Sequence, residues 1–242
     1  MRIIPFSTLN SPCPYLADRA CKLEYHYIEN CTFSHNANLV KHGFRRFGKY
    51  FQKPICDNCN ECKSVRIDVL NFKFSKSLRR VMNKNKNKNT KTITSRPILD
   101  DEHIRLFNKY HDFMHEKKQW RKNNINFRSY FDIYVDGFEN FGYEISYYSE
   151  TNQLICVDLI DLVDDGISSI YCFWDPDFSH LSLGKYSLLK EIEYAKNLNL
   201  HWIYIGYLVK DCPSLRYKDD YKPYQTLLQY CDIDKNEIWE FL

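Results

Sequence analysis

The chain has 242 residues, enough for one large domain or two small ones with a core of their own. Its formal net charge of +3 excludes a uniformly basic nucleic-acid coat, so what matters is where the positive charge gathers. No apolar run approaches the ~18 residues that span a bilayer, and the N-terminal residues lack the ~7–15-residue apolar core of a signal peptide. We therefore expect a cytoplasmic protein without a membrane partner, whose ten cysteines form no disulfides.

The first part of the chain has the pattern of short strands. Residues 21–28 alternate apolar and polar side chains, which predicts a half-buried strand. Ser34 is expected to cap a short helix. Residues 43–54 and 65–72 predict further extended segments, with a cysteine-rich loop between them.

Three cysteines in this loop, Cys56, Cys59 and Cys62, follow two successive C-x-x-C spacings. Such spacing is typical of thiolate metal ligands, and a closed tetrahedral site needs a fourth. Spacing alone does not separate a zinc ion from an iron–sulfur cluster. The scattered cysteines are expected to be small buried apolar residues: Cys21, Cys31, Cys156, Cys172, Cys212 and Cys231.

The next segment is strongly basic. Residues 73–91 contain eight Lys or Arg and no acidic residue. Ser75 or Ser77 is expected to cap a short helix that carries Arg79 and Arg80. A solvated charged loop is the simpler interpretation, but a one-sided run in a nearly neutral protein favours contact with a polyanion.

These patterns divide the chain into three parts. Residues 1–84 form a cysteine-rich region with strands, and residues 85–99 form a polar basic linker. Residues 100–242 form the second region, which we expect to pack against the first.

The second region mixes helices and strands. Helices are expected at residues 100–118, 127–135 and 182–199. Strands are expected at residues 141–149, 154–163, 167–175 and 201–207. An antiparallel meander followed by a helix and a further strand predicts an α+β fold.

This order resembles the core of the acetyltransferase (GNAT) superfamily, in which a ligand lies where a strand gives way to a helix. Here that junction is "FWDPDFSHLSLGKYSLL". The superfamily's coenzyme A loop is rich in glycine, and only Gly184 is present. We therefore expect neither coenzyme A nor, because no nucleotide-binding loop is present, ATP.

Several motifs together resemble those of the bacterial aminoacyl-tRNA–protein transferases of the N-end rule pathway. The similarity is strongest to the aspartate/glutamate leucyltransferase branch, which is related to the eukaryotic arginyltransferases. The motifs are "CPYLADR", "GFRRFG", "KPICDNCNEC", "VRIDV", "FSKSLRR", "FWDPDFSHLSLG", "WIYIGY" and "CPSLRYK". The chain departs from the family pattern at Phe47, where serine is usual, and at Gln52, where an aromatic residue is usual.

The resemblance implies that leucine moves from Leu-tRNA to the α-amine of proteins that begin with Asp or Glu. These products would then reach an N-end rule adaptor and protease, which are indirect partners. The resemblance also implies that Cys13 is the fourth thiol beside Cys56, Cys59 and Cys62, and that the four hold a zinc ion or an iron–sulfur cluster.

The resemblance and the chemistry together suggest site residues. Around the acyl site we expect Asp175, Asp177 and Tyr207 as catalytic residues, with the backbone of Ser182, Leu183 and Gly184 at a helix start. An acidic acceptor side chain needs a cation, and the pool is Arg45, Arg46 and Arg66, with Arg79 and Arg80. Tyr217 or Trp174 could stack on the terminal adenine. The basic segment would hold the tRNA through Lys73, Lys76, Arg79, Arg80 and Lys84.

Simpler interpretations exist for most of these residues: a turn, a helix cap, a solvated face or core packing. Other functions also remain open. One is an arginyl-tRNA–protein transferase of the same fold, and another is a non-catalytic zinc module that binds RNA. A coenzyme A-dependent acetyltransferase is weakened by the absence of its phosphate loop.

Overall fold

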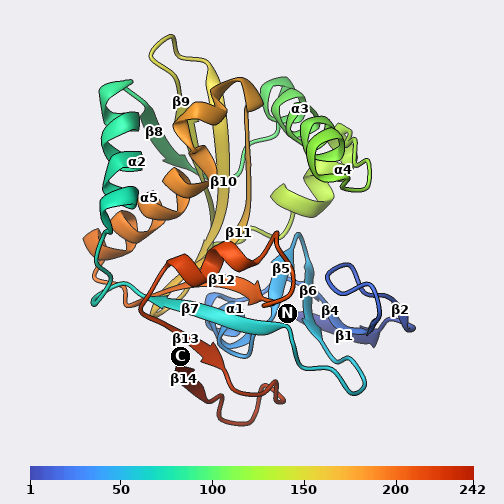
Figure 1. Ribbon diagram of the computed structural model, residues 1–242. Helices are drawn as coiled ribbons and strands as arrows, with labels where there is room; N and C mark the ends of the chain where they lie inside the picture. Colours follow the sequence, from blue (N-terminus) through green and yellow to red (C-terminus); the bar gives the residue numbers. More distant parts are fainter.

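The computed structural model describes residues 1–242. Its largest element is a mixed sheet of eight strands in the order β14-β13-β7-β12-β11-β10-β9-β8 (Figure 1). Their bounds are β7 Lys63–Asp68, β8 Lys91–Ser95, β9 Gly142–Tyr148, β10 Leu154–Leu162, β11 Gly166–Trp174, β12 Trp202–Leu208, β13 Tyr224–Leu227 and β14 Trp239–Phe241.

A second sheet of four strands is built from the first part of the chain in the order β1-β4-β6-β5, and two short strands, β2 and β3, pair beside it. We call the four-stranded sheet the N-terminal sheet. The bounds are β1 Arg2–Ser7, β2 Ser11–Pro12, β3 Ala20–Cys21, β4 Leu23–Glu29, β5 Arg45–Phe47 and β6 Tyr50–Pro54.

Helices cover both faces of the eight-stranded sheet (Figure 1). On one face α2 packs on α5, and α5 contacts β11 and β12; on the other, α3 contacts β10 and β11. The bounds are α1 Phe33–Lys41, α2 Lys76–Asn87, α3 Asp101–Lys118, α4 Phe127–Tyr130 and α5 Leu183–Asn197. Single helical turns lie at η1 Phe131–Val135, η2 Pro176–Leu181 and η3 Arg216–Asp220. No helix combines the length and the apolar composition needed to cross a bilayer.

The α+β fold is confirmed, because antiparallel β9-β10-β11 are followed by α5 and by β12, which is parallel to β11. This is the element order expected for an acetyltransferase-like core. The predicted cap Asp100 is also confirmed, since its side chain accepts from His103 N–H. The Ser34 cap is wrong: Thr32 caps α1 and accepts from His35 N–H.

The linker prediction for residues 85–99 is corrected by the structure, which has the end of α2 and the edge strand β8 there. The reason is a buried asparagine within a low-complexity sequence. Asn85 is fully buried and donates from Nδ2 to the carbonyls of Val81 and Leu181. One apolar residue, Leu78, is buried on the same helix. A polar run can therefore form a helix when a single side chain replaces its hydration with protein hydrogen bonds.

The first region is joined to the second through β7, which lies between β12 and β13 in the large sheet. Val65 and Ile67 on β7 are almost fully buried in the main core. The strand that follows the cysteine loop is thus part of the same sheet as the second region, as the expectation that the two regions pack together requires.

Candidate active site

The parallel pair β11–β12 is short, and the two strands then separate. Only Gly166–Ser168 pairs with Trp202–Tyr204. Beyond this point the pairing of β12 with β7 shifts register at Gly206, which has φ +73°. A gap therefore opens between β11 and β12 in the middle of the sheet, and its free backbone groups need other partners.

Arg45 of β5 fills this gap. Its Nη2 donates to the carbonyl oxygens of Ile170 at 2.7 Å and Ser169 at 3.4 Å. A Cβ atom at position 206 would lie 1.6 Å from Nη1 of Arg45, so only glycine lets the guanidinium enter. The half-buried guanidinium has no carboxylate within ion-pair distance, which leaves a cation free to receive an anionic ligand.

A second basic residue, Lys218, lies near Arg45. It is almost completely buried, and its Nζ donates to the carbonyl of Tyr207 at 2.5 Å. Burial first, and then the positive charge of Arg45, hold the pKa of Lys218 well below its ordinary value. Lys218 was missed by sequence reasoning although it ends the "CPSLRYK" motif, because lysine is normally an exposed residue.

Tyr207, a sequence-predicted catalytic residue, borders the same centre. Its hydroxyl donates to the carbonyl of Gln52 at 3.2 Å, and its ring centroid lies 5.9 Å from the guanidinium carbon of Arg45. Burial raises the pKa of this phenol far above its usual range, so it stays neutral. Tyr207 therefore serves to fix the position of Arg45 and of the β6 backbone, and it carries no charge.

The start of α5 offers backbone donors. Ser182 has a left-handed conformation with φ 57°, and its side chain makes no cap. The N–H groups of Leu183 and Gly184 have no hydrogen-bond partner. Gly184 lies against the indole of Trp174, to which a Cβ atom would come within 3.3 Å. Free N–H groups at the start of a 15-residue helix favour an oxyanion or a phosphate.

The two predicted catalytic carboxylates have a structural role. Asp175 is buried and accepts from Asp177 N–H at 3.0 Å at the start of η2. Lys109 of α3 contacts both, at 2.5 Å to Asp175 and 2.7 Å to Asp177. Both carboxylates are thus paired with Lys109, and Asp175 caps η2, in agreement with the simpler interpretation of a turn and a helix cap.

Two of the five arginines in the predicted acceptor-binding pool, Arg46 and Arg66, are engaged elsewhere. Arg46 is buried and makes a bidentate pair with Asp161, with both nitrogen–oxygen distances 2.7 Å. Its remaining nitrogen donates to the carbonyl of Gly48 at 3.0 Å. The sequence "RR" does not reveal this difference, because adjacent residues on a strand point to opposite faces.

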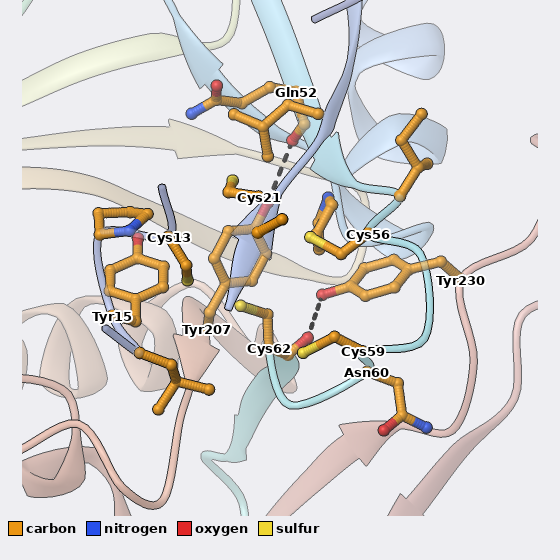
Figure 2. A pocket seen from close by; sticks show the side chains of 16 residues that line it. Cys13, Tyr15, Cys21, Gln52, Cys56, Cys59, Asn60, Cys62, Tyr207 and Tyr230 are labelled. Atoms are coloured by element: carbon orange, nitrogen blue, oxygen red, sulfur yellow. Dashed lines mark hydrogen bonds between the residues drawn. The ribbon is translucent and has the colours of Figure 1, made fainter. Parts of the chain in front are cut away.

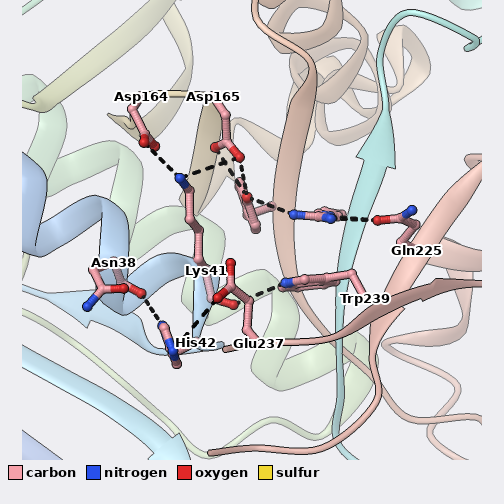
Figure 3. Close-up of polar contacts among 10 residues, drawn as sticks. Asn38, Lys41, His42, Asp164, Asp165, Gln225, Glu237 and Trp239 are labelled. Carbon is pink, nitrogen blue, oxygen red and sulfur yellow. Dashed lines mark hydrogen bonds and ion pairs between the residues drawn. The ribbon is translucent and has the colours of Figure 1, made fainter. Parts of the chain in front are cut away.

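Figure 3 shows a polar cluster in which Lys41 of α1 contacts Asp164 of the β10–β11 turn and accepts from the indole of Trp239. Arg66 is stacked between two indole rings beside this cluster. Its guanidinium carbon lies 4.0 Å from the ring of Trp202 and 4.5 Å from that of Trp239. Its Nε and Nη2 both donate to Gln225, at 2.9 and 2.7 Å. Arg66 thus holds β7, β12 and the C-terminal strands together, and Arg45 alone remains near the gap.

The predicted thiols line one cavity of about 360 Å³ beside Tyr207 (Figure 2). Cys13, Cys56, Cys59 and Cys62 all contribute, and so does Cys21, which sequence reasoning assigned to the core. Burial first, and then neighbouring thiols, raise the pKa of Cys21 to about 11. No three side chains in the structure are arranged as metal ligands. Five thiols around one cavity nevertheless match the ligand type of a thiolate-bound ion or cluster.

The predicted tRNA residues on α2 and just before it form an exposed basic surface. Ser75 caps the helix and accepts from Leu78 N–H. None of the five predicted cations makes an ion pair, and Lys84 donates to the carbonyl of His180 at 2.9 Å. Exposed cations without acidic partners are typical of a phosphate-binding surface.

Replacement of Lys76, Arg79 and Arg80 by alanine should weaken the binding of every tRNA to a similar extent. The contacts would be to phosphates, so the slope of log K against log salt should fall by about 2–3. Filter binding at three salt concentrations measures both quantities. An unchanged slope would show that the surface is only solvated.

Comparison with known proteins agrees with this architecture. Residues 11–80 match the family model for the N terminus of arginine-tRNA-protein transferase, and residues 102–228 match that for its C terminus. The chain is 55% identical to the aspartate/glutamate leucyltransferase of Campylobacter jejuni (strain RM1221), with 98% of each chain covered. It is 35% identical to that of Helicobacter hepaticus, with 99% of this chain and 98% of the relative covered.

Among solved structures, FemX superposes with a TM-score of 0.45 at 10% identity, over 75% of this chain and 61% of the other. The sequence matches extend over nearly the whole length and include the gap, the thiols and the basic helix. The chain therefore belongs to the arginine-tRNA-protein transferase family and, within it, to the bacterial aspartate/glutamate leucyltransferases.

Proposed function

We propose that this protein transfers leucine from Leu-tRNA to the α-amine of proteins that begin with Asp or Glu. The observation that carries the acceptor part is Arg45, a half-buried guanidinium without a carboxylate partner in the gap of the sheet. An acceptor carboxylate would supply the missing counter-charge, with Lys218 nearby. The leucine part is supported by the names of the relatives. The arginyl variant and the non-catalytic RNA module are not favoured.

The reaction would be the aminolysis of an ester. The nitrogen lone pair of the acceptor forms a bond to the leucyl carbonyl carbon, the carbon–oxygen bond to the ribose breaks, and the proton of the amine passes to the ribose oxygen. An α-amine has a pKa near 7.7–8, so roughly a tenth or more is neutral at pH 7 without an enzymic base. Positioning and stabilisation of the oxyanion would therefore provide most of the rate.

The residues would divide this work between two sides of the gap. Arg45 would orient the acceptor through its first side chain. The N–H groups of Leu183 and Gly184 would donate to the oxyanion or to a phosphate of the tRNA end. The exposed ring of Tyr217 would stack on the terminal adenine. The exposed cations of α2 would hold the tRNA. The protein would act in the cytoplasm, where tRNA occurs, and its products would pass to an N-end rule adaptor and protease.

Mass spectrometry after incubation with Leu-tRNA or Arg-tRNA tests the proposal. With peptides beginning with Asp, Glu, Lys or Arg, we expect leucine on the first two only. Arg45→Gln should raise KM for the Asp peptide about ten- to hundredfold, because one charge-assisted interaction of ~1.5–3 kcal/mol is lost. Leucine on the Lys peptide would contradict the acceptor assignment, and arginine on the Asp peptide the donor assignment.

We further propose that Cys13, Cys56, Cys59 and Cys62 hold a zinc ion or an iron–sulfur cluster, which would supply a cross-link between the N-terminal segment and the loop before β7. Cys59→Ser should lose the metal and lower the melting temperature, because the loop would lose its cross-link. Metal analysis and calorimetry measure the two effects. Cys31→Ser, outside the cavity, is the control for metal content. A Cys59→Ser variant with full metal content and unchanged stability would contradict the proposal.

A further inference from the structure

One face of the N-terminal sheet is partly exposed and leads to Arg45. Residues paired across adjacent strands point to the same face. Phe6 pairs with Tyr25, Tyr25 with Gln52, and Gln52 with Arg45. These residues therefore form one continuous row from the edge strand β1, across β4 and β6, to the gap between β11 and β12.

A second row runs beside the first, through Ile4, Tyr27, Tyr50 and Phe47. Within the rows, Phe6 stacks on Tyr25 at 5.2 Å, and the rings of Tyr27 and Tyr50 lie 5.1 Å apart. Between the rows, the rings of Phe6 and Tyr25 each lie 6.5 Å from that of Tyr50. We call these two rows the aromatic platform. Ile4, Phe6 and Tyr50 are 41%, 44% and 43% exposed. On the opposite face, Ile28 of β4 and Phe51 of β6 are buried in a small core.

Two ligands of the proposed reaction could use such a surface, the acceptor polypeptide or the single-stranded tRNA end. Charge favours the polypeptide. Among the side chains paired across this face, Arg2 is the only other cation and lies 3.9 Å from Glu29, so Arg45 is the only unpaired cationic side chain there. An RNA strand needs several cations along its path. Those cations are on α2, which lies on the opposite side of the molecule (Figure 1).

We propose that the aromatic platform binds the N-terminal segment of the acceptor protein. This inference rests on the proposed function. The first residue lies at Arg45, and the following residues cross the sheet toward β1. Three inter-strand spacings of ~4.8 Å separate Arg45 from Phe6, a distance of about 14 Å that about four extended residues span. Acceptor residues 2–5 therefore contact the platform, and apolar side chains there favour binding by burial against the exposed rings.

The test compares an eight-residue peptide that begins with Asp and has apolar residues 2–5 with the dipeptide that shares its first two residues. The measured quantity is the ratio of kcat/KM for the long peptide to that for the dipeptide. Phe6→Ser and Tyr50→Ser should each lower this ratio about tenfold, the effect of ~1.4 kcal/mol of lost contact. Ile93→Ser, at a 55% exposed position on the distant edge strand β8, is the matched control and should leave the ratio unchanged.

Fluorescence anisotropy of the labelled long peptide, without tRNA, separates this proposal from the proposed function. A wild-type protein that transfers leucine to no peptide would refute the function, yet tighter anisotropy for wild type than for Tyr50→Ser would still support the platform. A ratio and an anisotropy unchanged by Phe6→Ser and Tyr50→Ser would overturn the platform. So would a loss of tRNA affinity in these variants with a reduced salt slope, which would assign the surface to RNA.

Discussion

Replacement of Arg46 by leucine should reduce the free energy of unfolding by about 3–5 kcal/mol, because it leaves the carboxylate of Asp161 buried without a counter-charge. Asp161 has no exposed surface, and both of its oxygens accept from Arg46. The pair joins β5 to β10 and so supports the strand that carries Arg45. Urea denaturation followed by circular dichroism measures the loss.

Two further variants make this result specific. Arg46→Leu with Asp161→Leu should recover much of the lost stability, since the double variant buries no charge. Arg128→Leu removes an exposed Arg–Asp pair with a similar 2.9 Å contact to Asp132, and it should cost at most about 1 kcal/mol. If Arg46→Leu were as mild as Arg128→Leu, the buried pair would not be important for stability.

Replacement of Glu191 by glutamine should stabilise the protein at high pH. Glu191 on α5 and Asp158 on β10 are both buried and face each other, and one oxygen of Glu191 and both of Asp158 lack partners. Burial first raises the pKa of Asp158 to about 7. Burial, and then the charge of Asp158, raise the pKa of Glu191 well above its ordinary value. Both groups are thus protonated in the folded protein at low pH.

The direction of the pH dependence of stability follows from the linkage between proton binding and folding. The pKa values are raised on folding, so the unfolded chain releases these protons at lower pH than the folded one. The stability contributed by the pair is fully present below the unfolded pKa values near 4, and it decreases as the pH rises through 7. Glu191→Gln should therefore gain on the order of 2–4 kcal/mol relative to wild type between pH 5 and pH 9.

Thermal unfolding of both proteins at five pH values between 5 and 9 is the measurement. Glu193→Gln, two residues further along α5 and partly exposed beside Lys190, is the control and should follow the wild-type curve. Parallel curves for wild type and Glu191→Gln would mean that the carboxyl pair does not titrate in this range.

Local patterns were sufficient for most of the secondary structure. Strand-like runs divided by turn residues identified the meander strands, and Asp100 marked the start of α3, because these signals depend on neighbours along the chain. The doubled C-x-x-C also indicated, from the sequence alone, thiols that line one cavity. The linker prediction failed because the burial of Asn85 depends on a distant carbonyl, that of Leu181.

The site itself depended on contacts between residues far apart in the sequence. The sequence contains "RR" at positions 45 and 46 but does not indicate that one guanidinium enters a gap beside Gly206 while the other pairs with Asp161. Likewise, Cys21 lines the thiol cavity and Lys218 contacts Tyr207 only because segments from both ends of the chain converge there. The sequence by itself determined the elements, the thiol motif and the basic helix. Only the tertiary structure decided which charges are left unpaired, because pairing and desolvation depend on distance in space.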